Sequence, residues 1–214
     1  MLYRQVIKPL LDRFLAALAI LALIPVWIIL ALAIKLDDPG PVLFRQRRIA
    51  KDRDGQIQFF QIYKYRTMKM STPRDIPTHM LENPEQYITR LGAFLRKTSL
   101  DELPQIFNIF LGQMSIVGPR PALWNQEDLY EERAKYGANA LTPGLTGWAQ
   151  INGRDELPIE VKARLDGEYV EKQSLLFDIK CIFGTVLSVL KSDGVVEGGT
   201  GALEAEKETE EAVR

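Results

Sequence analysis

Cysteine and histidine are nearly absent from this 214-residue chain, which contains one of each, Cys181 and His79. A single cysteine cannot form an intramolecular disulfide, so no disulfide framework supports the fold, and a reducing compartment is favoured. A single histidine excludes zinc sites of the HExxH type and iron sites built from several imidazoles. The length corresponds to one domain of ordinary size, or to a smaller domain with an appended segment.

The sequence also has little net charge, −1, but its charged residues are unevenly distributed. The segment from Glu197 to Arg214 contains six glutamates against one lysine and one arginine, a balance of −4. The chain totals are 27 basic and 28 acidic residues, so the preceding residues hold 25 basic and 22 acidic side chains. The tail has almost no large apolar residues, and we expect residues 197–214 to form a flexible acidic terminus.

Charge is missing altogether from Phe14–Ile34, an apolar run that as a helix would reach across roughly 30 Å of hydrocarbon. Pro25 interrupts the run near its middle, where it removes a backbone hydrogen bond and kinks the helix. Basic residues flank both ends, so by the positive-inside rule both ends prefer the cytoplasm. We therefore favour a re-entrant helix-break-helix over a spanning helix. A cleaved signal peptide is a further alternative, because Ala31–Ala33 resembles a cleavage site. The flanking basic residues are Arg4, Lys8 and Arg13 before the run and Lys35, Arg45, Arg47, Arg48, Lys51 and Arg53 after it.

The rest of the sequence predicts one β-hairpin and five helices. Val42–Ile49 and Gln56–Tyr65 are β-rich runs joined around Asp54-Gly55, a dipeptide typical of tight turns. Ser71–Pro84 is polar and contains three prolines, which indicates a loop. The last helix has an apolar face suited to packing or to lying at a membrane surface. The predicted helices cover Leu91–Arg96, Leu103–Leu111, Ala122–Tyr136, Pro158–Lys172 and Leu175–Lys191.

Two adjacent carboxylates, Asp101 and Glu102, lie close in sequence to Arg96 and Lys97. Ser99 and Glu102 fit a capping box, in which both side chains merely start a helix. Pro104 then falls where a backbone N–H is needed, whereas with Asp101 as the N-cap it falls in the tolerated first turn. Either way, capping explains one carboxylate and leaves the second, with its basic neighbours, unexplained.

Two further segments combine cations with restricted or glycine-rich backbone. Arg120 stands between two prolines within Ser115–Pro121, which suits a guanidinium that clamps an anion; the alternative is a turn with a surface arginine. Leu141–Arg154 is a glycine-punctuated loop whose Asn152 and Arg154 are candidates for contact with a polar ligand; the alternative is a structural connection with a tryptophan in the core.

The hairpin contributes two more cations, Lys64 and Arg66. Many cations around one acidic pair suit a substrate that carries phosphates together with a divalent metal. The same cations would suit nonspecific binding to nucleic acid or anionic lipid. The acidic pair favours the first interpretation, because carboxylates beside phosphates cost energy unless a metal or a reaction requires them.

From about Arg4 to Gly194 the sequence resembles the bacterial sugar transferases, in particular the small monotopic polyprenol-phosphate phosphoglycosyl transferases. Each matching segment alone is weak, but five in the same order are specific. The segments are Asp12 with the helix broken at Pro25, Phe59–Met68, Arg90–Gln105, Ser115–Pro121 and Pro143–Arg154.

The resemblance implies transfer of a sugar 1-phosphate from a UDP-sugar to a polyprenyl phosphate such as undecaprenyl phosphate, with release of UMP. This reaction would be the first membrane step of glycoconjugate assembly. Asp101 matches the nucleophile, which forms a covalent aspartyl-phosphosugar, and Glu102 matches the second acid, expected with Asp101 to hold Mg²⁺. Lys64, Arg96 and Arg120 match basic residues around the phosphates. We expect Arg66, Asn152 and Arg154 to add substrate contacts, and we expect no nucleic-acid partner.

The resemblance also implies an architecture and a location. We expect an α+β fold, a mostly helical small domain with a β-hairpin, anchored by the re-entrant membrane helix and by interfacial amphipathic helices. Residues 1–36 would form the membrane helix, 37–196 the catalytic domain and 197–214 the tail, at the cytoplasmic face of the inner membrane. Ile24 precedes Pro25 where the family commonly has serine, so proline and packing alone are expected to hold the break.

Two other interpretations stay open at this stage. In the first, the chain is a non-enzymatic membrane-anchored module whose basic hairpin binds anionic lipid or nucleic acid, and both carboxylates are dispensable. In the second, the chain is secreted after signal cleavage. No segment of the sequence distinguishes a hexose from an N-acetylated sugar, and none indicates an oligomeric state.

Overall fold

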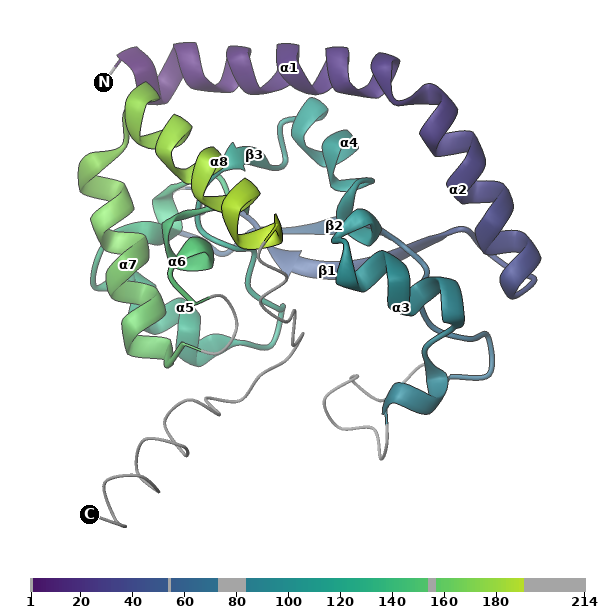
Figure 1. The fold of residues 1–214 in the computed structure, drawn as a ribbon. Coiled ribbons are helices and arrows are strands. Elements are labelled where there is room, and N and C mark those ends of the chain that lie inside the picture. The colour runs from purple at the N-terminus through teal and green to yellow at the C-terminus, as the bar shows by residue number, and fades with distance from the viewer. Residues whose placement is uncertain (1, 54, 73–83, 154–156, 191–214) are drawn as a thin grey trace, which may run out of the picture.

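The computed structural model describes residues 2–53, 55–72, 84–153 and 157–190, and within these ranges helices pack against two small sheets (Figure 1). The expected mixture of helices with a β-hairpin is confirmed. The predicted tail and most of the predicted loop lie outside the described residues. The elements are η1 (Tyr3–Ile7), α1 (Lys8–Ala22), α2 (Ile24–Asp37), β1 (Leu43–Ile49), β2 (Phe59–Tyr65), η3 (Pro84–Tyr87), α3 (Arg90–Lys97), η4 (Leu100–Glu102), α4 (Gln105–Phe110), β3 (Ser115–Val117), α5 (Glu127–Ala134), η5 (Ala138–Ala140), β4 (Gly144–Thr146), α6 (Trp148–Ile151), α7 (Ile159–Lys172) and α8 (Leu175–Leu190).

The predicted hairpin is confirmed as an antiparallel pair of β1 and β2, with Leu43 opposite Tyr65. Helix α4 is held against the outer edge of β2 by one buried side chain. The amide of Asn108 donates to the carbonyl of Gln61 (2.8 Å) and accepts from the backbone N–H of Tyr63 (3.0 Å). This pairing satisfies backbone groups that an edge strand leaves open, and it fixes α4 next to Lys64.

The glycine-rich segments meet in the second sheet, where β3 pairs with β4 in parallel. A side chain at Gly144 would place its Cβ 2.1 Å from the backbone nitrogen of Gly118, and one at Gly147 would lie 2.1 Å from the Gly118 carbonyl oxygen. Only glycine permits this backbone approach. The glycine punctuation is therefore explained by packing, which favours the structural alternative for that loop.

Helices α1 and α2 form a bent pair, with an angle of 64° at a break around Leu23. Pro25 lies in the first turn of α2, so the predicted helix-break-helix is confirmed. No single described helix has the length and hydropathy to cross a membrane, whereas the bent pair meets those criteria taken together. The expectation that proline and packing alone hold the break is wrong, because the indole N–H of Trp27 donates to the carbonyl of Ile20 (3.1 Å).

Most predicted helices are confirmed within a few residues, but the one over Ala122–Tyr136 begins only at Glu127. The residues before it continue the hairpin instead. The carbonyl of Ala122 accepts from the N–H of Ile49 (2.9 Å), and Leu123 forms an antiparallel bridge with Arg48. This pairing with β1 outweighs the local helical pattern, since tertiary hydrogen bonds routinely override propensity.

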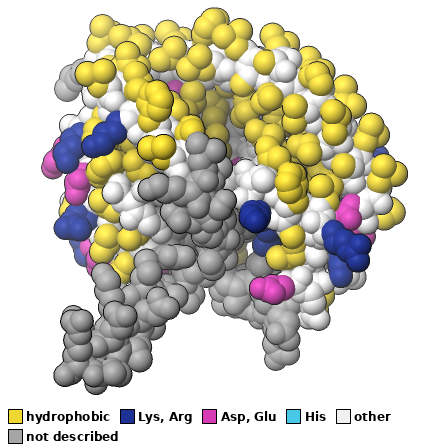
Figure 2. Space-filling view, viewed as in Figure 1, with side chains coloured by type: hydrophobic (Ala, Val, Ile, Leu, Met, Phe, Trp, Pro, Cys, Tyr) yellow, Lys and Arg dark blue, Asp and Glu magenta, His cyan; other side chains and the backbone are white. Residues whose placement is uncertain are grey.

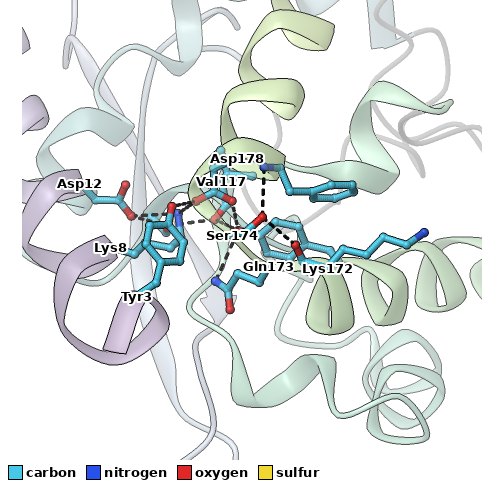
Figure 3. Close-up of polar contacts among 11 residues, drawn as sticks. Tyr3, Lys8, Asp12, Val117, Lys172, Gln173, Ser174 and Asp178 are labelled. Atoms are coloured by element: carbon cyan, nitrogen blue, oxygen red, sulfur yellow. Dashed lines mark hydrogen bonds and ion pairs between the residues drawn. The ribbon is translucent and has the colours of Figure 1, made fainter. Parts of the chain in front are cut away.

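A buried polar cluster joins α1 to α8 and to β3 (Figure 3). The ammonium of Lys8 lies 2.7 Å from a carboxylate oxygen of Asp178 and 3.3 Å from one of Asp12. All three side chains are almost fully buried. The cluster therefore fixes the beginning of α1 to the body of the protein. Three hydroxyl groups complete it, those of Tyr3 and Tyr169 donating to Asp178 and that of Ser115 donating to Asp12.

Candidate active site

Asp101 lies on a strained turn. Among the described residues, Ser99 is the one non-glycine residue with a left-handed backbone, at φ 55°. Such a conformation costs on the order of 1–3 kcal/mol and persists where the surrounding structure imposes it, often at functional sites. The turn leads directly into η4, where Asp101 is buried with 4% of its surface exposed. Because a strained backbone leads into the buried Asp101, the carboxylate of Asp101 is a candidate catalytic group.

Glu102 points between two cations that come from distant parts of the chain. Its Oε1 lies 3.0 Å from the ammonium of Lys64 on β2 and 3.2 Å from the guanidinium of Arg120. Burial alone would raise the pKa of Glu102, but the two cations outweigh burial and hold that pKa well below its usual range. Glu102 therefore stays ionised and is unsuited to donate a proton.

The capping-box interpretation of this segment is wrong. Ser99 makes no side-chain capping hydrogen bond, and the carboxylate of Glu102 binds Lys64 and Arg120 instead of a backbone N–H. The alternative with Asp101 as N-cap is also wrong, because α4 begins at Gln105 and is preceded by Pro104. The proline thus stands just before the helix, where its missing N–H costs nothing.

Arg120 is held by a partner that sequence reasoning missed. Its carbonyl oxygen accepts from the guanidinium of Arg133 (2.9 Å), which also forms a 2.7 Å ion pair with the fully buried Asp166. The two prolines around Arg120 and this ion pair together restrict its backbone. No local sequence pattern indicates this contact, because 33 residues separate Arg133 from Asp166.

Gln105 is a second residue that sequence reasoning missed. Gln105 begins α4 four residues after Asp101, and the backbone of Leu103 and Pro104 between them is right-handed helical. Gln105 is 2% exposed, and its Nε2 has no hydrogen-bond partner. An unpaired donor in this buried position, four residues from Asp101 in the chain, is a candidate to bind an acceptor on a substrate.

The remaining predicted cations lie around this centre in different ways. Arg96, on α3, donates from Nε to the hydroxyl of Thr67 (2.9 Å), two residues beyond β2. Arg66 instead connects the end of α2 to the hairpin, since its guanidinium contacts Asp38 and the carbonyl of Pro41 (2.7 Å). These contacts indicate a structural use for Arg66.

The glycine-rich loop contributes less than its sequence suggested. Asn152 is exposed, and its amide donates back to the carbonyl of Trp148 (2.7 Å), which caps α6. Arg154 lies outside the described residues. Trp148 is half-buried and donates its indole N–H to Glu168 (3.1 Å). The described part of this loop therefore serves mainly to connect β4 to α7.

Apolar side chains are exposed over the bent helix pair. Figure 2 shows hydrophobic side chains covering the side of the molecule where Figure 1 places α1 and α2. Isolated exposed apolar residues are normal, whereas a continuous surface of this kind marks an interaction with a partner or a membrane. The exposed residues include Leu10, Phe14, Leu18 and Leu21 on α1, Ile24, Ile28, Ile29, Leu32 and Leu36 on α2, and Leu176, Phe183 and Leu187 on α8.

Comparisons with known proteins place the chain in a family. Residues 3–192 match the family model described as bacterial sugar transferase. A UDP-glucose:undecaprenyl-phosphate glucose-1-phosphate transferase of Xanthomonas campestris pv. campestris is 39% identical over 195 residues, covering 88% of this chain and 40% of the relative. The protein of the same name from Escherichia coli (strain K12) is 41% identical, covering 82% of this chain and 38% of the relative.

A shorter relative is covered almost completely. The exopolysaccharide production protein PSS of Rhizobium leguminosarum bv. phaseoli is 38% identical over 195 residues, covering 86% of this chain and 96% of the relative. The chain thus spans about two fifths of the first two relatives and nearly the whole of this one.

Proposed function

Because the chain belongs to the bacterial sugar transferase family, we propose that it transfers a sugar 1-phosphate from a UDP-sugar to a polyprenyl phosphate and releases UMP. Two relatives are named for UDP-glucose and undecaprenyl phosphate, which makes these the first donor and acceptor to test. The observation that carries the proposal is the burial of Asp101 directly after a strained turn. The adjacent Glu102 forms ion pairs with two cations from other parts of the chain.

In the first step, a carboxylate oxygen of Asp101 attacks the sugar-bearing phosphorus of the donor. The bond from that phosphorus to the bridging oxygen breaks, and its electron pair leaves with UMP. The product is an acyl phosphate between Asp101 and the sugar phosphate, which divides one difficult displacement into two easier ones. Lys64 and Arg120, both held at Glu102, supply positive charge where negative charge accumulates on the phosphoryl oxygens.

In the second step, a phosphate oxygen of the polyprenyl phosphate attacks the same phosphorus. The bond between phosphorus and the Asp101 oxygen breaks, which regenerates the carboxylate and yields a polyprenyl-diphosphate sugar. The unpaired Nε2 of Gln105 is available to donate to a phosphoryl oxygen during either step. The ionised Glu102 holds the two cations in place.

The donor set fits Mg²⁺ as cofactor. Asp101 and Glu102 offer carboxylate oxygens, and within the described ranges no cluster of three or more acidic, histidine or cysteine side chains occurs. Mg²⁺ commonly binds one or two carboxylates and completes its coordination with substrate phosphates and water, so two acids suffice. When bound, the ion would neutralise diphosphate charge and make UMP a better leaving group.

The function assay measures UMP release from a panel of UDP-sugars, with and without polyprenyl phosphate. We expect sustained release only when donor, acceptor and Mg²⁺ or Mn²⁺ are all present, and no release in EDTA. Full activity in EDTA would remove the metal from the proposal without affecting the transfer. Absence of UMP from every donor, together with lipid or nucleic-acid binding that falls steeply with salt, would favour the non-enzymatic alternative.

We also propose that the α1–α2 pair enters the membrane and returns to the cytoplasmic face. Both ends of the pair pack on the same body. Lys8, at the beginning of α1, is ion-paired to Asp178, and Ile34, near the end of α2, packs in a core cluster with Tyr65 and Leu95. If the pair spanned the membrane, one of its two ends would lie on the far side of the bilayer and would lose its contact with the body of the protein. The exposed apolar side chains around the break support the same placement.

Cysteine labelling tests this topology in a chain with Cys181 replaced by alanine. We expect cysteines at the exposed positions Gln5 and Arg45 to react with an impermeant reagent from the cytoplasmic side only. A cysteine at Leu21, which is also exposed but lies beside the break, should be protected by lipid. Labelling of positions 5 and 45 from opposite sides would establish a span instead.

A further inference from the structure

A side chain closes the break between α1 and α2. The backbone N–H of Leu23 donates to Ala19 (3.0 Å), and the helical pattern resumes where the N–H of Trp27 donates to Leu23 (2.9 Å). Pro25, between them, has no N–H to donate. The indole N–H of Trp27 reaches back seven residues and donates to the carbonyl of Ile20 (3.1 Å). This bond links the last turn of α1 to the first turns of α2.

The same indole ring packs on the core beneath the candidate active site. Its centroid lies 6.2 Å from the ring of Tyr65 on β2 and 5.3 Å from the ring of Phe107 on α4. Tyr65 follows Lys64, which is paired with Glu102, and Phe107 lies two residues after Gln105. Trp27 therefore contacts the break through its N–H and, through its ring, the elements that carry Lys64 and Gln105, β2 and α4.

We infer that Trp27 is a positioning residue that sets the angle of the bent helix pair relative to the active site. The effect of Trp27 on catalysis rests on the proposed function, whereas its effect on the helix angle does not. A carbonyl that loses its backbone donor at a helix break cannot bond to water inside a membrane. A side-chain donor in a fixed position therefore restricts the break to one angle. The aromatic contacts then relate that angle to β2 and α4.

The indole N–H and the indole ring make separable contributions. 3-Benzothienylalanine at position 27 replaces the N–H by sulfur and keeps the shape of the ring, so the contacts with Tyr65 and Phe107 persist. Trp27→Phe removes the N–H and part of the ring. Trp124→Phe is the matched control, because Trp124 is half-exposed and distant in sequence from the break.

The structural test uses spin labels at Leu10 on α1 and Leu32 on α2, both exposed, in a chain lacking Cys181. In vesicles of bacterial phospholipid, we expect the distance distribution between the labels to lengthen and broaden in the benzothienylalanine and Trp27→Phe proteins, and to be unchanged in Trp124→Phe. An unchanged distribution in the benzothienylalanine protein would overturn the inference, whether or not the enzyme is active.

The kinetic test separates positioning from general damage. We expect the benzothienylalanine protein to show a KM for polyprenyl phosphate raised by about two- to tenfold, the range for loss of one hydrogen bond. The single burst of UMP from donor alone should keep its rate, because the ring at position 27 still packs against Tyr65 and Phe107. An equal loss in both half-reactions would contradict the role of the N–H. A wild-type protein that releases no UMP refutes the proposed function only, since the label distances still decide the role of Trp27.

Discussion

Replacing Asp101 with asparagine should lower turnover by about a thousandfold or more, the scale on which nucleophile removal acts in enzymes with covalent intermediates. The amide has the size of the carboxylate and fits the same buried position. It cannot form an acyl phosphate with the sugar phosphate, so the first step of the proposed mechanism is lost. The measurement is steady-state UMP release at saturating donor and acceptor.

Three controls make this result specific to the nucleophile. Asp128→Asn removes an exposed carboxylate at the start of α5 and should leave turnover unchanged. Thermal unfolding of Asp101→Asn should differ from that of the parent by no more than about 1 kcal/mol, which excludes misfolding. Wild-type protein given donor alone should carry one phosphosugar adduct, located on Asp101 by mass spectrometry. Substantial turnover in Asp101→Asn without any adduct would favour direct attack by the lipid phosphate.

The two carboxylates of this site were predictable from sequence, but the reason for their placement was not. Adjacent acids near basic residues are visible in the sequence, and a local capping pattern offered a competing explanation. The absence of a capping hydrogen bond at Ser99 and the ion pairs of Glu102 decide between them, and no short window of sequence reports either. The two cations that contact Glu102 are likewise distant in sequence: Lys64 lies 38 residues before it and Arg120 lies 18 residues after it.

The fold shows the same division between local and distant causes. The hairpin and the helix over Ile159–Lys172 follow from alternation, turn residues and helical periodicity, and they were predicted closely. The start of α5 was misplaced because Ala122 pairs with β1, a contact across 73 residues. The Trp27 indole bond was missed because an aromatic residue in an apolar run gives no sign of where its N–H points.

Replacing Lys8 with methionine should lower the free energy of unfolding by about 3–5 kcal/mol, the cost of removing one partner from a buried charge cluster. The methionine retains the apolar stem but leaves the carboxylates of Asp12 and Asp178 buried near each other without their shared cation. Chemical denaturation of the detergent-solubilised protein measures the effect. The matched control is Lys172→Met, because the ion pair of Lys172 with Glu168 is largely exposed and should contribute about 0–1 kcal/mol.

A double variant distinguishes an uncompensated charge from lost packing. Adding Asp178→Asn to Lys8→Met removes one of the two remaining carboxylate charges. The amide oxygen can still accept from one of the hydroxyls of Tyr3 and Tyr169, and the amide NH2 can donate to the other. The double variant should therefore recover part of the lost stability, a non-additive result expected for groups in direct contact. If Lys8→Met costs no more than Lys172→Met, the cluster does not hold α1 to the body. The attachment of α1 to the body would then rest on its apolar contacts, such as those of Ala16 in a core cluster with Phe60 and Ile109.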